Sequence, residues 1–201
     1  KMNYPLLFWL KKDFLMKGSE AISAVMAELG DEPVVNANGF IGREAFKAKD
    51  REANFYMIGS MGLASSMGLG VALSQPEKKA VILDGDGNVL MAMGTLAMIA
   101  AAAPKNLVHV TIDNRVYEST GSQKTLSGTI ELHKVAESVG YRNSSVADDL
   151  DTLKKELRQA LDSDGPSFIL ARVEPNFDHQ SGRVIHTPEE IKQRFMTAIK
   201  S

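Results

Sequence analysis

The order of apolar and polar residues along the chain predicts alternating strands and helices. Short apolar runs rich in β-branched residues are typical of buried strands, and we predict strands at residues 34–35, 80–83, 107–112, 144–146 and 167–173. Between them, apolar residues recur every three or four positions, as on the buried face of a helix. We predict helices at residues 19–29, 42–49, 89–103, 131–139, 150–161 and 188–199. This alternation predicts an α/β fold, in which a mainly parallel sheet is flanked by helices on both faces.

Three further features of the pattern lead to expectations about burial. The predicted helix at residues 89–103 is apolar on almost every side, so we expect it to be buried, and a subunit interface is one place where it could be covered. His109 lies inside a predicted strand, and we expect it to pack in the core. Residues 51–56 show neither rhythm, and we predict a loop there that returns to the candidate ligand site described below.

The composition limits the class of protein. A length of 201 residues is enough for one domain, which we place at residues 18–201 after an N-terminal arm at residues 1–17. No apolar run is long enough to cross a membrane. The absence of cysteine excludes a disulfide framework and cysteine-ligated zinc or iron–sulfur sites. The net charge of −2, with scattered basic residues, argues against nucleic acid as a partner. We therefore expect a cytoplasmic protein that acts on a small molecule.

Acidic, amide and glycine residues stand at the ends of two of the predicted strands. Residues 80–83 run into Asp84-Gly85-Asp86-Gly87, and residues 107–112 run into Asp113-Asn114. The carboxyl ends of parallel strands are where open α/β sheets bind ligands. Glycines allow the backbone to approach a ligand, and the helix that begins near Asn88 offers N–H groups to an anion. Since carboxylate and amide oxygens are ligands that Mg²⁺ prefers, this edge suits a diphosphate bridged by Mg²⁺.

The spacing of these residues carries a family resemblance. Gly85-Asp86-Gly87, followed after 26 residues by Asn114, resembles the thiamine diphosphate signature of the pyruvate-decarboxylase-like enzymes. The resemblance implies the diphosphate-binding domain of the thiamine diphosphate-binding fold over most of the chain. It also implies that Mg²⁺ is bound by Asp86, Asn114 and the main-chain oxygen of Val116, and that Gly85, Gly87 and Asn88 contact the cofactor.

Two earlier segments extend the resemblance. Asn38-Gly39-Phe40 resembles a Thr-Gly-Phe element that helps to hold the diphosphate, although Asn-Gly is also simply a good turn. Gly59-Ser60-Met61-Gly62 is similar to a Gly-x-Met-Gly element. The resemblance implies that the Gly59 carbonyl accepts from the cofactor's 4′-amino group, and that Met61 is an apolar wedge that holds the cofactor bent. The alternative for the small residues from Gly59 to Gly70 is close helix–strand packing.

The loop after Asn114 bears on the substrate. Ser119-Thr120-Gly121-Ser122-Gln123 resembles the Ser-Thr-Gly-x-Gln element of β-type chains in the sulfopyruvate/phosphonopyruvate decarboxylase family. The resemblance implies decarboxylation of 3-sulfopyruvate to sulfoacetaldehyde and CO₂, on the route to coenzyme M. Phosphonopyruvate is the alternative substrate, and a non-catalytic cofactor-binding or assembly module is the alternative from another class. Arg115 and Lys124 are candidates to meet the acidic group of the substrate, although exposed loop cations are usually just solvated.

The resemblance covers only half of what such an enzyme needs. Enzymes of this family also have a pyrimidine-binding domain, whose glutamate activates the cofactor. The resemblance therefore implies that this chain is the β subunit of a hetero-oligomer, that a partner α subunit carries the glutamate, and that the chain alone is inactive.

Overall fold

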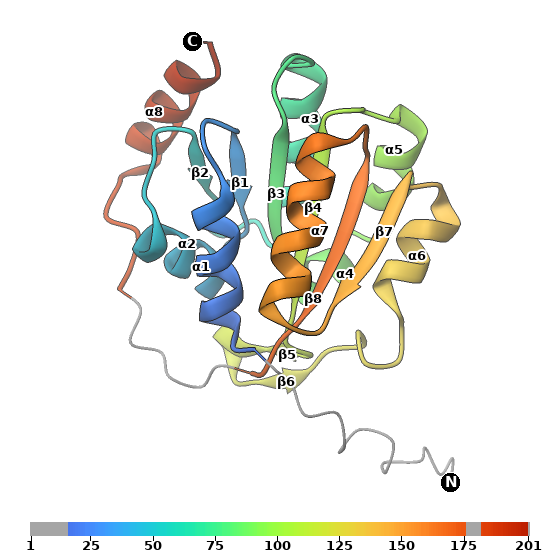
Figure 1. Ribbon diagram of the computed structural model, residues 1–201. Coiled ribbons are helices and arrows are strands. Elements are labelled where there is room, and N and C mark those ends of the chain that lie inside the picture. The colour runs from blue at the N-terminus through green and yellow to red at the C-terminus, as the bar shows by residue number, and fades with distance from the viewer. Residues whose placement is uncertain (1–15, 176–181, 201) are drawn as a thin grey trace, which may run out of the picture.

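The computed structural model describes residues 16–175 and 182–200, which form three layers with a sheet in the middle (Figure 1). Most of the predicted arm at residues 1–17 lies outside the described residues. The strands are β1 (Val34–Asn36), β2 (Asn54–Tyr56), β3 (Ala80–Gly85), β4 (Leu107–Asp113), β5 (Val116–Tyr117), β6 (Gln123–Lys124), β7 (Asn143–Ala147) and β8 (Ser167–Arg172). The helices are α1 (Gly18–Glu28), α2 (Phe40–Ala48), α3 (Ala64–Ser74), α4 (Asp86–Met91), α5 (Gly94–Ala102), α6 (Leu132–Val139), α7 (Leu150–Asp162) and α8 (Pro188–Lys200), with a short 3-10 helix at Glu118–Thr120.

Six of the strands form one parallel sheet, as the alternating pattern predicts. The strand order is β2-β1-β3-β4-β8-β7, and every neighbouring pair is parallel. The chain runs outward from β1 to β2 and then returns to the other side of β1 as β3. Such a reversal opens a crevice at the carboxyl ends of the strands, where α/β proteins bind ligands.

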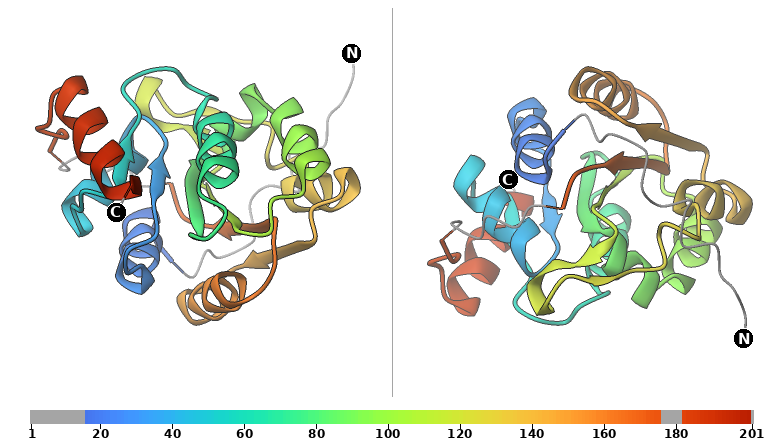
Figure 2. Two further views of the ribbon diagram at one scale, coloured as in Figure 1. Left: turned by 90° about the horizontal axis from the view of Figure 1, so that it is seen from above. Right: turned by 90° about the horizontal axis from the view of Figure 1, so that it is seen from below.

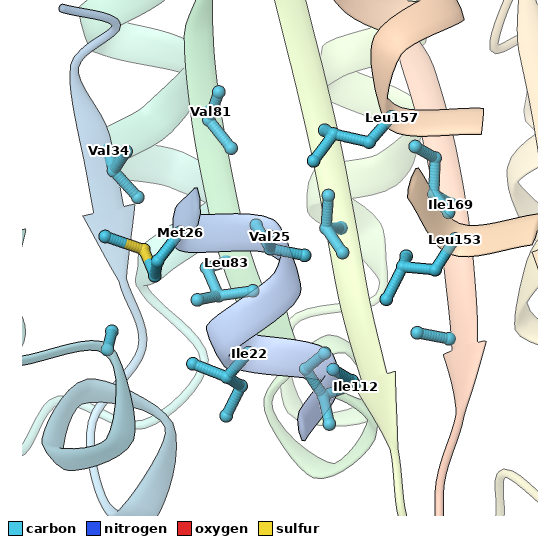
Figure 3. Close-up of a cluster of buried hydrophobic side chains, with 14 of the residues drawn as sticks. Ile22, Val25, Met26, Val34, Val81, Leu83, Ile112, Leu153, Leu157 and Ile169 are labelled. Carbon is cyan, nitrogen blue, oxygen red and sulfur yellow. The ribbon is translucent and has the colours of Figure 1, made fainter. Parts of the chain in front are cut away.

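Helices cover both faces of the sheet (Figures 1 and 2). Helices α1 and α7 lie on one face, and α3, α5 and α6 lie on the other. Because successive side chains of a strand point to opposite faces, β3 contributes to both cores. Val81 and Leu83 pack under α1 with Ile22 (Figure 3), while Ile82 packs under α3 with Leu69.

Helix α3 lies so close to β3 that Gly68 has no room for a side chain. A Cβ atom at Gly68 would lie 2.2 Å from Cγ1 of Ile82. We therefore expect Gly68→Ala to lower the free energy of unfolding by about 1–3 kcal/mol in urea denaturation, as overpacked cores do. Gly70 is the matched control, because no other heavy atom lies within 4 Å of its Cβ position. We expect Gly70→Ala to be neutral or to stabilise by up to about 1 kcal/mol. Equal losses for both variants would refute this close packing.

The prediction of a loop at residues 51–56 is wrong, because this segment ends in β2 at the edge of the sheet. Three residues are too few to show a strand rhythm. Pairing with β1 and the cover of α8 make Asn54–Tyr56 a strand, and the side chain of Asn54 donates to the carbonyl of Lys49 at 2.8 Å.

The prediction of one buried helix at residues 89–103 is also wrong. Two helices, α4 and α5, occupy this stretch, with a break at Ala92 and Met93. The described residues do not cover all of the apolar side chains, since Met91 is 61% exposed and Met98 is 60% exposed. Periodicity correctly reports apolar residues on all sides but does not say which of them this chain covers.

The longest of these helices, α7 and α8, have 13 residues each. Within residues 16–175 and 182–200, no helix is long and apolar enough to cross a membrane.

Candidate functional site

A cleft opens at the carboxyl ends of β1, β3 and β4. The hairpin of β5 and β6 lies at this end of the sheet, which the right-hand view of Figure 2 shows from below. The predicted site residues that line the cleft are Asn38, Gly39, Phe40, Met61, Gly85, Asp86, Gly87, Asn88, Asn114 and Val116. These residues come from four separate segments, so the fold brings most of the predicted site together.

Asp84–Gly87 forms a direct passage from strand to helix, because β3 continues to Gly85 and α4 begins at Asp86, two residues before the predicted start near Asn88. Neighbouring side chains crowd the two glycines. A Cβ atom at Gly87 would lie 2.6 Å from Cε1 of Tyr117, and one at Gly85 would lie 2.9 Å from Cδ1 of Ile41. The cleft wall here is therefore bare backbone, which fits the close approach of a diphosphate to main-chain groups.

Two buried carboxyl groups lie at the neighbouring ends of β3 and β4. Asp86 is 2% exposed and Asp113 is 1% exposed. Burial, and after it the negative charge of Asp113, raises the pKa of Asp86 to about 7. Burial likewise raises the pKa of Asp113. A divalent cation at Asp86 would offset both the desolvation and the repulsion, so these acids fit the proposed metal.

Asn114 and Val116 are distant from Asp86 in the sequence, but they line the same cleft. Asn114 Oδ1 accepts from the N–H of Val116 at 3.1 Å, and Asn114 Nδ2 donates to Glu118 Oε2 at 2.7 Å. The amide is held at both ends, and its oxygen retains a second lone pair for a ligand. No group of three or more histidine or acidic side chains in the described parts of the chain could hold a metal. The predicted set does not need one, since it contains one carboxylate.

The segment from Gly59 to Gly62 has an unusual backbone. Gly59, Ser60 and Gly62 have φ values of +70°, +52° and +90°. Asn88 Oδ1 accepts from the N–H of Gly62 at 2.7 Å, so the side chain of Asn88 holds this loop against α4. Met61 reaches the cleft and lies beside Gly87, whereas Gly59 and Ser60 are exposed and do not line it. The role of the Gly59 carbonyl stays a prediction.

The Asn38-Gly39-Phe40 element brings the start of α2 to the cleft. Gly39 precedes the helix with φ of +80°, and Phe40 is the first residue of α2. Gly18 and Ser19, at the start of α1, also line the cleft. Sequence reasoning missed this second helix start, because only the folding of α1 beside β4 brings it to the site.

The two substrate candidates are not among the residues that line the cleft. Neither Arg115 nor Lys124 lines the cleft, and Lys124 is exposed on β6. Their contact with the acidic group of a substrate stays a prediction.

His109 is buried as expected, but it is part of a polar network rather than simple packing. Its Nε2 atom lies 3.2 Å from Asp84 Oδ2, and its Nδ1 atom lies 3.3 Å from the hydroxyl of Tyr141. Asp84 Oδ1 also accepts from the N–H of Gly85 at 2.9 Å. The network therefore holds the Asp84 side chain at the end of β3, next to the cleft residue Gly85.

Comparisons with known proteins identify the family of this chain. Residues 43–171 match the family model described as thiamine pyrophosphate enzyme, C-terminal TPP binding domain. The chain is 44% identical over 187 residues to sulfopyruvate decarboxylase subunit beta of Methanothermobacter thermautotrophicus, covering 92% of this chain and 97% of that one. It is also 44% identical over 176 residues to phosphonopyruvate decarboxylase of Streptomyces viridochromogenes, covering 87% of this chain and 44% of that one. The chain thus spans less than half the length of the second relative.

A solved structure confirms the fold. The thiamine diphosphate-dependent 4-hydroxybenzoylformate decarboxylase of Rhodococcus jostii superposes with a TM-score of 0.71 at 18% identity, covering 84% of this chain and 34% of that one. At this identity, the likeness shows the architecture alone. With a family match over more than half of its length and a relative that it covers almost completely, this chain belongs to the thiamine pyrophosphate enzyme family, and it carries the C-terminal TPP binding domain.

Proposed function

We propose that this chain is the β subunit of a thiamine diphosphate-dependent decarboxylase that converts 3-sulfopyruvate to sulfoacetaldehyde and CO₂. One observation carries the proposal: Asp86, Asn114, Val116 and Met61 converge on one glycine-lined cleft, in a chain that matches a β subunit almost end to end. Thiamine diphosphate, when bound, supplies the electron sink that lets CO₂ leave a 2-oxo acid.

Different residues of the cleft would contact the metal, the diphosphate and the rest of the cofactor. Asp86, Asn114 and the main-chain oxygen of Val116 would hold Mg²⁺, whose positive charge would offset the negative charge of the diphosphate. The bare backbone at Gly85 and Gly87, with the start of α2, would face the phosphates. Met61 would support the bent shape of the cofactor, because its side chain lines the cleft beside Gly87.

A partner α subunit with the activating glutamate is part of this proposal. One relative is named as a subunit beta, and another relative is more than twice as long as the part that this chain matches. The exposed apolar side chains of Leu63, Met91 and Met98 also suit a surface that another chain covers. The cytoplasmic location and the link to coenzyme M remain expectations of the proposal.

Phosphonopyruvate is the second candidate substrate, because a phosphonopyruvate decarboxylase is as similar in identity as the β subunit. A non-catalytic cofactor-binding module is the alternative from another class.

Native mass spectrometry of the protein, purified from its own cells with Mg²⁺ and thiamine diphosphate, tests the proposal. We expect a complex with a second chain and one cofactor per pair, which releases CO₂ faster from sulfopyruvate than from phosphonopyruvate. The reverse preference would replace the substrate. A homo-oligomer that binds cofactor without turnover would support the module instead.

A further inference from the structure

Two buried hydroxyl groups lie on the carboxylate of Asp86. Thr125 is 5% exposed and Ser127 is 7% exposed, and both follow β6 directly. Thr125 Oγ1 donates to Asp86 Oδ2 at 2.5 Å, and Ser127 Oγ lies 2.9 Å from the same oxygen. The two contacts span 39 and 41 positions of the sequence, so no local sequence pattern predicts them.

The hydroxyls also connect Asp86 to the end of the neighbouring strand. Ser127 Oγ lies 2.7 Å from Asp113 Oδ1 and 2.9 Å from Thr125 Oγ1. The four side chains therefore form one buried network between the ends of β3 and β4, with Ser127 at its centre.

The same network closes the loop that carries the other proposed metal ligands. This loop, residues 114–127, contains Asn114 and Val116 and returns to its starting point. The N–H of Thr125 donates to the carbonyl of Arg115 at 2.9 Å, so the base of the loop is fastened beside Asp86. The segment from Thr125 to Ser127 thus fastens the base of the loop and contacts the Asp86 carboxylate.

A carboxylate that binds a small cation must be held at a defined rotation. Hydrogen bonds from outer groups to a ligating side chain supply this orientation, and their loss typically weakens metal binding 10- to 100-fold. Because both hydroxyls contact Oδ2, together they fix the rotation of the Asp86 carboxyl group.

We propose that Thr125 and Ser127 are positioning residues of the metal site, which orient Asp86 for a divalent cation and couple closure of loop 114–127 to cation binding. The inference rests on the proposed function only in taking Asp86 as a Mg²⁺ ligand.

The test compares hydroxyl removal with hydroxyl retention in the full chain, assembled with its partner. Thr125→Val and Ser127→Ala remove a hydroxyl at nearly constant shape, whereas Thr125→Ser retains it. Thr129→Val is the matched control, since Thr129 is exposed in the following turn.

Calorimetric titration with thiamine diphosphate at a series of Mg²⁺ concentrations gives the half-saturating Mg²⁺ concentration. We expect a rise of about tenfold or more for Thr125→Val and Ser127→Ala. Thr125→Ser and Thr129→Val should stay within about twofold of the wild type.

A second measurement tests the coupling to the loop without cofactor turnover. Trypsin cuts after Arg115 and Lys124, which lie inside loop 114–127. We expect Mg²⁺ with thiamine diphosphate to slow cleavage at both positions in the wild type and in Thr125→Ser. At the same ligand concentrations, Thr125→Val should be cut at the rate of the metal-free protein.

The outcomes separate this inference from the proposed function. If Asp86→Asn retains Mg²⁺-dependent binding, the metal assignment itself is wrong. If Asp86→Asn loses it while Thr125→Val and Ser127→Ala bind Mg²⁺ like the wild type, the positioning role alone is overturned. Equal losses in Thr125→Ser and Thr125→Val would also overturn it, because the hydroxyl would then not be the group that matters. Should Ser127→Ala fail to fold, the two Thr125 variants decide.

Discussion

Asp86→Asn is expected to abolish Mg²⁺-dependent binding of thiamine diphosphate to the assembled protein. The substitution keeps the shape of the side chain but removes the one charged ligand in the proposed set. Losing one partner of a buried, charged contact weakens binding by roughly 2–5 kcal/mol, which is about 30-fold or more in affinity. Calorimetric titration of the cofactor, with and without Mg²⁺, measures the loss.

The fold should survive this change. Burial and the charge of Asp113 raise the pKa of Asp86 to about 7, so the ionised carboxylate is unfavourable in the metal-free protein at pH 8. A neutral amide removes that penalty, and we expect the metal-free variant to unfold at the same or a higher temperature. Glu44→Gln is the matched control, because Glu44 is a second buried acid of the same cleft and is not an assigned ligand. Cofactor binding by Asp86→Asn that still depends on Mg²⁺ would remove Asp86 from the site.

Met61→Ala is expected to lower turnover of the assembled decarboxylase by about 10- to 100-fold, with a much smaller effect on stability. A misplacement of about 1 Å can cost a hundredfold in rate, and the Met61 side chain is the apolar contact proposed to keep the cofactor in its reactive shape. The side chain is only half-buried, so its removal leaves little cavity in the core. CO₂ release under saturating cofactor and thermal unfolding of the same samples give the two effects.

Met67→Ala is the matched control for this experiment. Met67 is also half-buried, but it lies on α3 and does not line the cleft. We expect it to leave turnover within about twofold of the wild type, and Met61→Leu to restore most of the activity, because leucine also supplies an apolar contact. A loss of turnover in Met67→Ala as large as in Met61→Ala would remove the wedge role.

Local order in the chain determined the fold class and the centre of the site. The strand ending at Gly85 and the helix that follows are neighbours in sequence, so their junction and its glycines can be read from adjacent residues. The same holds for β4 and Asn114. A parallel sheet then brings both strand ends to one edge, because parallel neighbours end on the same side. For this reason the predicted ligands Asp86 and Asn114 lie on the wall of one cleft.

Tertiary structure alone decided the contacts that join distant segments. β2 is a strand because β1 offers it a partner, and no side chain of residues 16–175 and 182–200 covers Met91 and Met98 fully. The hydroxyls of Thr125 and Ser127 contact Asp86 although about forty residues separate them in the sequence, and their loop has no periodic pattern of apolar residues. Periodicity reports which face of a segment is apolar, whereas such contacts depend on where the whole chain places that segment. The sequence by itself therefore determined which residues are candidates for the chemistry, because they follow strand ends directly, and the fold decided which distant side chains contact them.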